Sequence, residues 1–135
     1  MAIDLEIVSP EKLLLSKAVD MAVLPAAEGE MGVLPGHAPM IVLLRGGTIK
    51  LTVGGSVVDT LYVSGGFAEV TPTRVTVLAN EATEVAALKR SEGEARLAAA
   101  EADYREAHAF DTESLSNAQA KIQAARAYIE ASPAA

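Results

Sequence analysis

Apolar and polar residues alternate with a period of two along most of the first 80 positions. The pattern is clearest in Ile-Asp-Leu-Glu-Ile over 3–7 and in Thr-Ile-Lys-Leu-Thr-Val over 48–53. A period of two is typical of strands with one buried face, and glycine or proline bounds most of the runs. Such runs occupy 3–8, 13–16, 19–24, 40–44, 48–53, 56–63, 67–70 and 74–79. They predict a β-sandwich or flattened barrel of about ten short strands, in which the continuous run 40–44 is wholly buried and Pro25 ends the strand before it.

Paired glycines mark the connections between these strands. Gly54-Gly55 predicts a tight two-residue hairpin, Gly65-Gly66 a bulge or corner, and Gly46-Gly47 a turn. None of the pairs is followed by Lys-Ser or Lys-Thr, or by a helical pattern, so a phosphate-binding glycine loop is excluded.

The composition changes after residue 80, where glycine becomes rare and alanine, glutamate, lysine and arginine predominate. These residues form helices readily. A first helix is expected from 83 or 84 to about 107, with an alternative start at Ser91, whose spacing to Glu94 is that of a capping box. Gly93 would be a weak point inside it, at a cost of about 1 kcal/mol relative to alanine.

A second helix is expected to the end of the pattern, from an N-cap at Asp111 or Thr112 to about Ala131. Residues 108–112 would form the break between the helices. Both helices carry apolar seams at spacings of three and four, so an antiparallel hairpin is expected. Alanine buries little area at about 25 cal/mol per Å², so the hairpin should be held only weakly. The seams are Leu88, Ala95, Ala98, Ala102 and Ala109 in the first helix and Leu115, Ala118, Ile122, Ala125 and Ile129 in the second.

Glycine and proline are most concentrated in the segment 28–39, which reads Glu-Gly-Glu-Met-Gly-Val-Leu-Pro-Gly-His-Ala-Pro. Three glycines and two prolines predict an exposed loop, whose middle, Val33-Leu34, returns to the core. Glu28, Glu30 and His37 would then point outward.

Composition excludes several classes of protein. A net charge of −7, an aromatic content of 4% and the absence of tryptophan disfavour nucleic-acid binding. The absence of cysteine excludes disulfides and thiolate metal sites. No apolar run approaches the roughly 20 residues that span a bilayer and no leader pattern is found, so we expect a soluble protein without membrane insertion.

An enzyme is also disfavoured. Two glutamates and a histidine within 28–37 could form a metal site or an acid–base pair, but they lie in a predicted loop and the other histidine, His108, is at the far helical turn. No catalytic residue, metal or cofactor is therefore expected.

The segment 28–39, Val-Ser-Gly-Gly-Phe-Ala-Glu-Val at 63–70 and Val-Thr-Val-Leu-Ala at 75–79, followed by two alanine-rich helices, resemble the bacterial-type epsilon subunit of F-type ATP synthases. The resemblance covers essentially the whole chain. It implies a non-catalytic central-stalk subunit of a proton-translocating synthase, peripheral to the cytoplasmic face of the bacterial inner membrane. Residues 1–82 would bind the gamma subunit and the loops of the c-ring, coupling one to the other. Residues 83–135 would form a hairpin that can extend toward the alpha/beta catalytic head and restrain ATP hydrolysis.

By the same resemblance Glu28, Glu30 and His37 would contact the c-ring. The alternative for these residues alone is two solvated acids and a histidine that caps the turn. Rim ion pairs of this kind fix register and on-rate more than affinity.

Some members of this family bind ATP through a pattern of Ile or Leu, Asp, two variable residues, Arg and Ala. The best match keeps only Leu88, and places Lys89 at the acid, Glu92 at the arginine and Gly93 at the alanine. Both charges are reversed, so we expect no tight nucleotide site.

The second helix holds few cations with which to grip an acidic partner. Lys121 and Arg126 stand against Asp111, Glu113 and Glu130. Weak or absent inhibition by the hairpin is therefore expected. From sequence patterns without the resemblance, a free-standing β-sandwich adaptor with a partner-binding helical hairpin remains the alternative.

Overall fold

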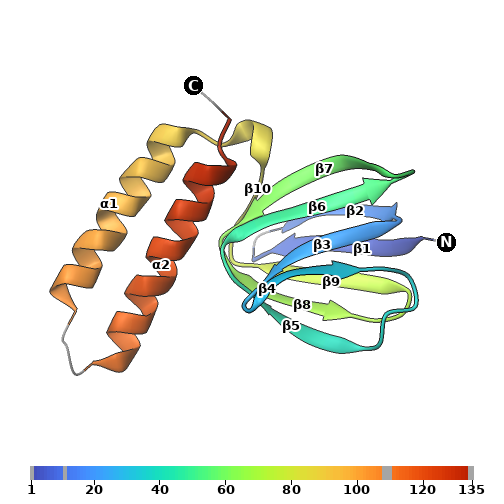
Figure 1. The fold of residues 1–135 in the computed structure, drawn as a ribbon, viewed down its shortest axis with the longest axis horizontal. Helices are drawn as coiled ribbons and strands as arrows, with labels where there is room; N and C mark the ends of the chain where they lie inside the picture. Colours follow the sequence, from blue (N-terminus) through green and yellow to red (C-terminus); the bar gives the residue numbers. More distant parts are fainter. Residues whose placement is uncertain (1, 11, 108–110, 134–135) are drawn as a thin grey trace.

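The computed structural model describes residues 2–10, 12–107 and 111–133. In this part of the chain ten strands are followed by two α-helices, and Figure 1 shows the helices side by side at one end of the strands. The elements are β1 (Ile3–Ser9), β2 (Lys12–Val19), β3 (Met21–Ala26), β4 (Gly29–Val33), β5 (Met40–Leu44), β6 (Gly47–Val53), β7 (Ser56–Val63), β8 (Gly66–Val70), β9 (Arg74–Ala79), β10 (Ala82–Glu84), the 3₁₀ turn η1 (Val85–Ala87), α1 (Arg90–Glu106) and α2 (Thr112–Ala131).

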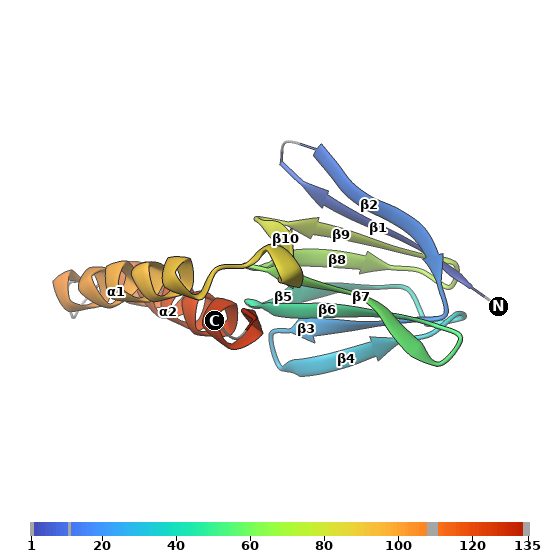
Figure 2. The same cartoon turned by 90° about the horizontal axis from the view of Figure 1, so that it is seen from above.

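The strands form a sandwich whose two layers are continuous at one corner. Hydrogen bonds connect them in the order β10-β7-β6-β3-β5-β8-β9-β1-β2, and β4 pairs with β3. The corner is the single pairing of Ala26 in β3 with Leu44 in β5. Figure 2 shows β3, β4, β6 and β7 below and β1, β2, β8 and β9 above. The predicted sandwich of about ten strands with a C-terminal helical hairpin is confirmed.

One pairing in the sandwich joins strands that are far apart in the sequence. β1 runs parallel to β9, with Leu5 opposite Val75 and Ile7 opposite Val77, whereas the other strand pairs of the described chain are antiparallel. β1 therefore lies between β2, which follows it directly in the sequence, and β9, which comes about 70 residues later.

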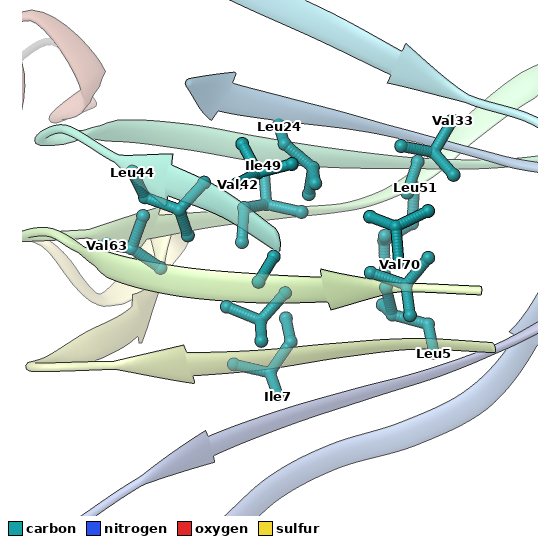
Figure 3. Packing of buried hydrophobic residues seen from close by; sticks show 14 of the residues in the cluster. Leu5, Ile7, Leu24, Val33, Val42, Leu44, Ile49, Leu51, Val63 and Val70 are labelled. Atoms are coloured by element: carbon teal, nitrogen blue, oxygen red, sulfur yellow. The ribbon is translucent and has the colours of Figure 1, made fainter. Parts of the chain in front are cut away.

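The core lies between the two layers and is built by strands alone. Ile3, Leu5 and Ile7 are fully buried and alternate with polar residues, as the period of two predicts. Every buried residue of this cluster comes from β1 to β9, and Figure 3 shows their aliphatic side chains meeting between the layers. The sandwich core is thus closed without the helices.

Two glycine connections are as predicted. Gly54 and Gly55 have φ of +62° and +81° and join β6 to β7 by the two-residue turn that positive φ at both positions favours. Gly65 and Gly66, with φ of +138° and +136°, form the corner between β7 and β8.

The predicted exposed loop at 28–39 is wrong over its first half. Residues 29–33 form β4, antiparallel to β3, because Met31 and Val33 lie toward the core in alternation and the edge of β3 is free to pair. Only 34–39 form a loop, and Leu34 points outward instead of returning to the core. Pro25 does not end β3, since it pairs with Glu30 of β4.

The first helix begins later than predicted from 83 or 84. Residues 82–84 form β10 instead, because the end of β7 offers an unpaired edge that Ala82 meets opposite Val63. α1 starts at Arg90 after the 3₁₀ turn, so Ser91 lies inside it and the capping box is not its start; the N-cap, Lys89, makes no side-chain capping bond.

The seam predicted for the first helix is wrong in part. Ala95 and Ala98 are exposed, whereas Leu88 is buried ahead of the helix and Ala102 is half-buried. The buried positions of α1 itself are Gly93 and Ala100. The structure instead confirms the second seam, in which Ala118 and Ala125 are buried and Leu115, Ile122 and Ile129 half-buried, as well as the N-cap Asp111, which accepts from the N–H of Ser114. His108 and Ala109, predicted in the break and the first seam, lie outside the described residues.

Candidate functional site

The three predicted contact residues lie along β4 but not together. Glu28 is in the turn between β3 and β4 and Glu30 follows on β4, both exposed. His37 is in the loop that leaves the other end of the strand, roughly 13 Å along at about 3.3 Å per residue. The N–H of Gly36 donates to the carbonyl of Pro72 at 2.8 Å and holds this loop against the β8–β9 turn. The two glutamates therefore lie at one end of β4, and the loop with the histidine leaves the other end.

Glu30 also lines a groove between the sandwich and α2. The groove has a volume of about 840 Å³ and contains Arg45, Lys50 and Arg126 besides a second acid, Glu130. Its charges are mixed, so the groove is not a dedicated anion site.

The segment that matches the nucleotide pattern lies at the start of α1 and packs against α2 and β7. Leu88 is buried against Tyr62 and Tyr128. Glu92 is exposed and accepts a hydrogen bond from Nε of Arg96 at 3.2 Å. At Gly93 a Cβ would lie 2.7 Å from Cγ1 of Ile129, so only glycine lets α1 approach α2 so closely.

Two tyrosines mark the place where the hairpin meets the sandwich. Tyr62 of β7 and Tyr128 of α2 pack edge to face, with ring centroids 5.0 Å apart and an angle of 74° between their planes. The hydroxyl of Tyr62 donates to the carbonyl of Ala124 at 2.9 Å. Burial, and then the charge of Glu81, raise the pKa of Tyr62 to about 12, so the phenol stays neutral and keeps donating.

Arg96 of α1 contacts three parts of the molecule at once. Its guanidinium donates to both carboxylate oxygens of Glu81, at 2.6 and 2.8 Å, and to Glu92 on its own helix. The same group lies 4.5 Å from the ring centroid of Tyr128. The hydrogen bonds to Glu81 raise the pKa of Arg96 above its already high ordinary value, so its charge is permanent.

A third contact pairs Gly46 with Gln123 of α2. The N–H of Gly46 donates to Oε1 at 2.9 Å and Nε2 of Gln123 donates back to the carbonyl of Gly46 at 2.6 Å. A Cβ at position 46 would lie 2.5 Å from Cα of Ala124, so α2 rests directly on the glycine backbone.

The outer face of the sandwich carries a row of apolar side chains across five strands. The strand registers place Leu43 of β5 opposite Phe67, Phe67 opposite Leu78, Leu78 opposite Val8 and Val8 opposite Leu13. Leu43 is 67% exposed, Leu13 56% and Phe67 44%. The prediction that 40–44 is wholly buried is therefore wrong, because alternate residues of β5 point outward. We call these five residues the outer row.

No helix in the described part of the chain is long and apolar enough to cross a membrane. Among the same residues no three His, Cys, Asp or Glu side chains cluster as a metal site would require.

Comparison with known proteins shows which family shares this sequence. The model of the ATP synthase delta/epsilon chain β-sandwich domain matches residues 2–85. The ATP synthase epsilon chain of Granulibacter bethesdensis is 63% identical over 127 residues, which cover 94% of each chain. That of Gluconacetobacter diazotrophicus is 49% identical over 131 residues, covering 97% of this chain and 93% of the relative. The chain belongs to the ATP synthase epsilon chain family.

Solved structures share the fold of this epsilon chain family member. A chain in the cryo-EM structure of the Euglena gracilis mitochondrial ATP synthase, OSCP/F1/c-ring, matches 96% of this chain and 81% of its own length, with a TM-score of 0.75 and 24% identity. A chain in the central stalk/c-ring structure from Tetrahymena thermophila matches with a TM-score of 0.63, 11% identity and 98% coverage of both chains.

Sequence reasoning missed the contacts between hairpin and sandwich and the outer row. Tyr62 and Tyr128 are two of the three tyrosines in a chain with 4% aromatic residues, but this scarcity does not distinguish them from Tyr104, which is 41% exposed. The outer row gives a weak signal, since Leu43 and Phe67 stand at outward positions of apolar runs.

Proposed function

We propose that this member of the epsilon chain family is a non-catalytic rotor subunit of a proton-translocating ATP synthase, where it joins the gamma subunit to the c-ring. In this proposal the sandwich binds both partners and the helices form an appended hairpin; β10 (Ala82–Glu84) extends the sandwich two residues past the predicted boundary at residue 82. The subunit would be peripheral to the membrane, on the cytoplasmic face of the bacterial inner membrane. Family membership supports the complex, and the outer row supports the contact with gamma.

The outer row is the observation that carries this proposal. Its five side chains come from five adjacent strands; four of them are exposed and Val8 is half-buried. A monomeric surface rarely exposes a contiguous apolar band unless a partner buries it. We assign gamma as that partner, because a rotor subunit needs one large and lasting contact that turns with it.

The c-ring contact is proposed at the β4 edge, with Glu28 and Glu30 at one end of the strand and His37 beyond the other. This edge pairs with β3 on one side and presents the carboxylates of Glu28 and Glu30 at one end, which suits contact with polar loops of a ring outside the bilayer. Because the acids and the histidine are separated, the contact would run along β4 and not around a single point.

For the hairpin we propose a subordinate role. The reversed charges at Lys89 and Glu92 argue against a tight nucleotide site, and the few cations of α2 argue for weak or absent inhibition of the alpha/beta head. Restraint of ATP hydrolysis, if measured, should then be small in the assembled enzyme.

The test is binding of purified gamma from the same organism to the full chain, measured by biolayer interferometry. The double variant Leu43→Glu, Phe67→Glu is expected to bind at least tenfold more weakly, because two adjacent exposed apolar side chains become charged. The matched control, Val57→Glu, changes a side chain that is 56% exposed on β7 of the other layer. It should bind as the unchanged chain does.

Two other outcomes would contradict the proposal. Unchanged binding by the double variant would show that the outer row does not face gamma. Absence of any binding by the unchanged chain would overturn the rotor role and favour the adaptor.

A further inference from the structure

We propose that Glu69 decides which surface can cover the outer row: its carboxylate requires a cation on the partner and excludes a second copy of this chain. The first half rests on the proposed contact with gamma, since the cation would be a lysine or arginine of that subunit. The second half, the exclusion of a second copy, concerns this chain by itself and is measured without gamma.

Glu69 lies inside the apolar surface of the outer face. It is on β8, two residues after Phe67, and both side chains are exposed. The strand registers place Ile41 of β5, which is 72% exposed, opposite Glu69 on one side and Thr76 of β9 on the other. Side chains directly opposite one another lie about 5 Å apart, and residues two positions apart along a strand about 7 Å. A partner that covers both Phe67 and Ile41 must therefore cover Glu69 as well.

The carboxylate of Glu69 has no partner in the part of the chain that the structure describes. Its side chain makes neither an ion pair nor a hydrogen bond there. Among the outward residues of β1, β5, β8 and β9, all of them described, Arg74 is the only cation. Nη1 of Arg74 lies 3.3 Å from Oε1 of Glu6, so this cation is already paired. Glu69 is thus an unpaired charge that water solvates in the free chain.

A partner that buries this face removes the water from Glu69. Removing water from an unpaired carboxylate is costly, and an opposite charge on the partner offsets the cost whereas an apolar surface does not. The apolar side chains of Ile41 and Phe67 on either side help to exclude water once they are covered. The surface that fits this face is therefore apolar, with a lysine or arginine opposite Glu69.

A second copy of this chain does not meet that requirement. Copies that pair about a two-fold axis bring the same patch of each chain face to face. The charged outward residues of β1, β5, β8 and β9 are Asp4, Glu6, Glu69 and Arg74. Three of them are carboxylates, and the guanidinium already contacts one of the three. Self-pairing would therefore bury Glu69 against a surface of its own sign, which selects against a second copy.

Glu84 provides a matched control for Glu69. It is an exposed glutamate on β10, which pairs with β7 of the other layer, and its side chain makes no capping bond to the turn that follows. Glu69→Gln and Glu84→Gln remove the same charge at nearly constant shape, one inside the outer face and one outside it. Glu69→Lys and Glu84→Lys reverse the charge at the same two places. An effect of net charge alone would be equal at the two positions.

The requirement for a cation is tested by binding of the full chain to purified gamma from the same organism, measured by biolayer interferometry at low and at raised salt. Glu69→Gln is expected to bind about tenfold more weakly and Glu69→Lys at least about 100-fold, because the cation of gamma first loses its counter-charge and then meets a like charge. Salt should weaken binding less in Glu69→Gln than in the unchanged chain, since one ion pair fewer is screened. The two Glu84 variants should bind as the unchanged chain does.

The exclusion of a second copy is tested by sedimentation velocity of the chain alone at rising concentration. Glu69→Gln is expected to raise the association constant about tenfold, because an unpaired charge no longer has to be buried. Glu84→Gln should change it less than about twofold, as a charge outside the interface does. Adding Leu43→Glu to Glu69→Gln should abolish the rise, because it places a charge back in the outer row.

The outcomes separate this inference from the rotor role. Equal gamma binding by the Glu69 and Glu84 variants would overturn the requirement for a cation, and the rotor role would still stand where the double variant Leu43→Glu, Phe67→Glu loses binding. Absence of binding by the unchanged chain would overturn the rotor role, and sedimentation would then decide on Glu69 by itself. Equal association constants for Glu69→Gln and Glu84→Gln would overturn the exclusion of a second copy.

Discussion

Replacement of Gly46 by alanine is expected to push α2 away from the sandwich without disturbing the strands. The added Cβ would lie 2.5 Å from Cα and 2.9 Å from Cβ of Ala124, and 3.0 Å from Oε1 of Gln123. Carbon atoms pack at about 3.5–4.0 Å, so the helix must retreat by about 1 Å. The φ of Gly46 is not positive, so the backbone of the turn accepts alanine without strain.

The cost follows from what this retreat breaks. It lengthens the two reciprocal hydrogen bonds between Gly46 and Gln123 and the bond from Tyr62 to the carbonyl of Ala124. Each such bond contributes about 1 kcal/mol net, and overpacking of a close contact costs about 1–3 kcal/mol. These are alternative ways of relaxing the same clash, so they do not add. Docking should weaken by about 2 kcal/mol, or about 30-fold in the equilibrium between docked and released hairpin.

Amide hydrogen exchange followed by mass spectrometry measures this effect in the sandwich and in the helices in one experiment. Peptides from α2 should exchange faster, whereas peptides from β1 and β9 should keep their protection. Gly32→Ala is the control, because a Cβ there meets only Sδ of Met21 at 3.9 Å. Unchanged exchange in α2 would refute the contact between Gly46 and α2. Equally faster exchange in β1 would refute the conclusion that the sandwich core is closed without the helices.

Three further results are expected from single positions. Gly66→Ala should lower the melting temperature sharply, because its φ is +136° and a Cβ would lie 2.2 Å from a carbonyl oxygen of β9. Hydrogen bonds from Ser114 hold the pKa of Asp111 below its ordinary 3.8. The cap of α2 is therefore complete above pH 3.8 and is lost as the pH falls through the lowered pKa, which circular dichroism should show as a loss of helicity in acid. Asp111→Asn should abolish this pH dependence. The pKa of Tyr62, raised from 10.0 to about 12, means that its contribution to stability is complete below pH 10 and is lost as the pH rises toward 12; tyrosinate absorbance and urea melts should show this, and Tyr62→Phe should not.

The parts of the fold that the sequence predicts are those decided within a few residues. Ile3, Leu5 and Ile7 point to the core because a strand alternates, and Gly54-Gly55 turns because two consecutive positive φ angles favour glycine. The cap at Asp111 is equally local. Each of these depends on neighbours in the chain, so no knowledge of distant contacts is needed.

The parts that it does not predict depend on distant partners. Residues 82–84 have the composition of a helix, yet they pair with β7 because that edge is open in the folded sandwich. Arg96 looks like one of several charged residues on a helix until Glu81 is placed opposite it. Leu43 and Phe67 resemble core residues because an exposed apolar side chain has the same chemistry as a buried one. The contacts proposed for Glu28, Glu30 and His37 stay predictions.

The parallel pairing of β1 with β9 constrains how the chain is made. Asp4 pairs with Arg74, 70 positions later, and at about 5–20 residues per second a ribosome needs roughly 4–14 s to add them. Throughout that interval the apolar side of β1 has no β9 to lie beside, so the nascent sandwich cannot close from its N-terminus onward. A chain stalled before β9 would expose apolar strand faces to which chaperones bind, whereas a chain stalled after β9 would already contain every strand of the core. The helices, translated after the strands, join a body whose interior is complete.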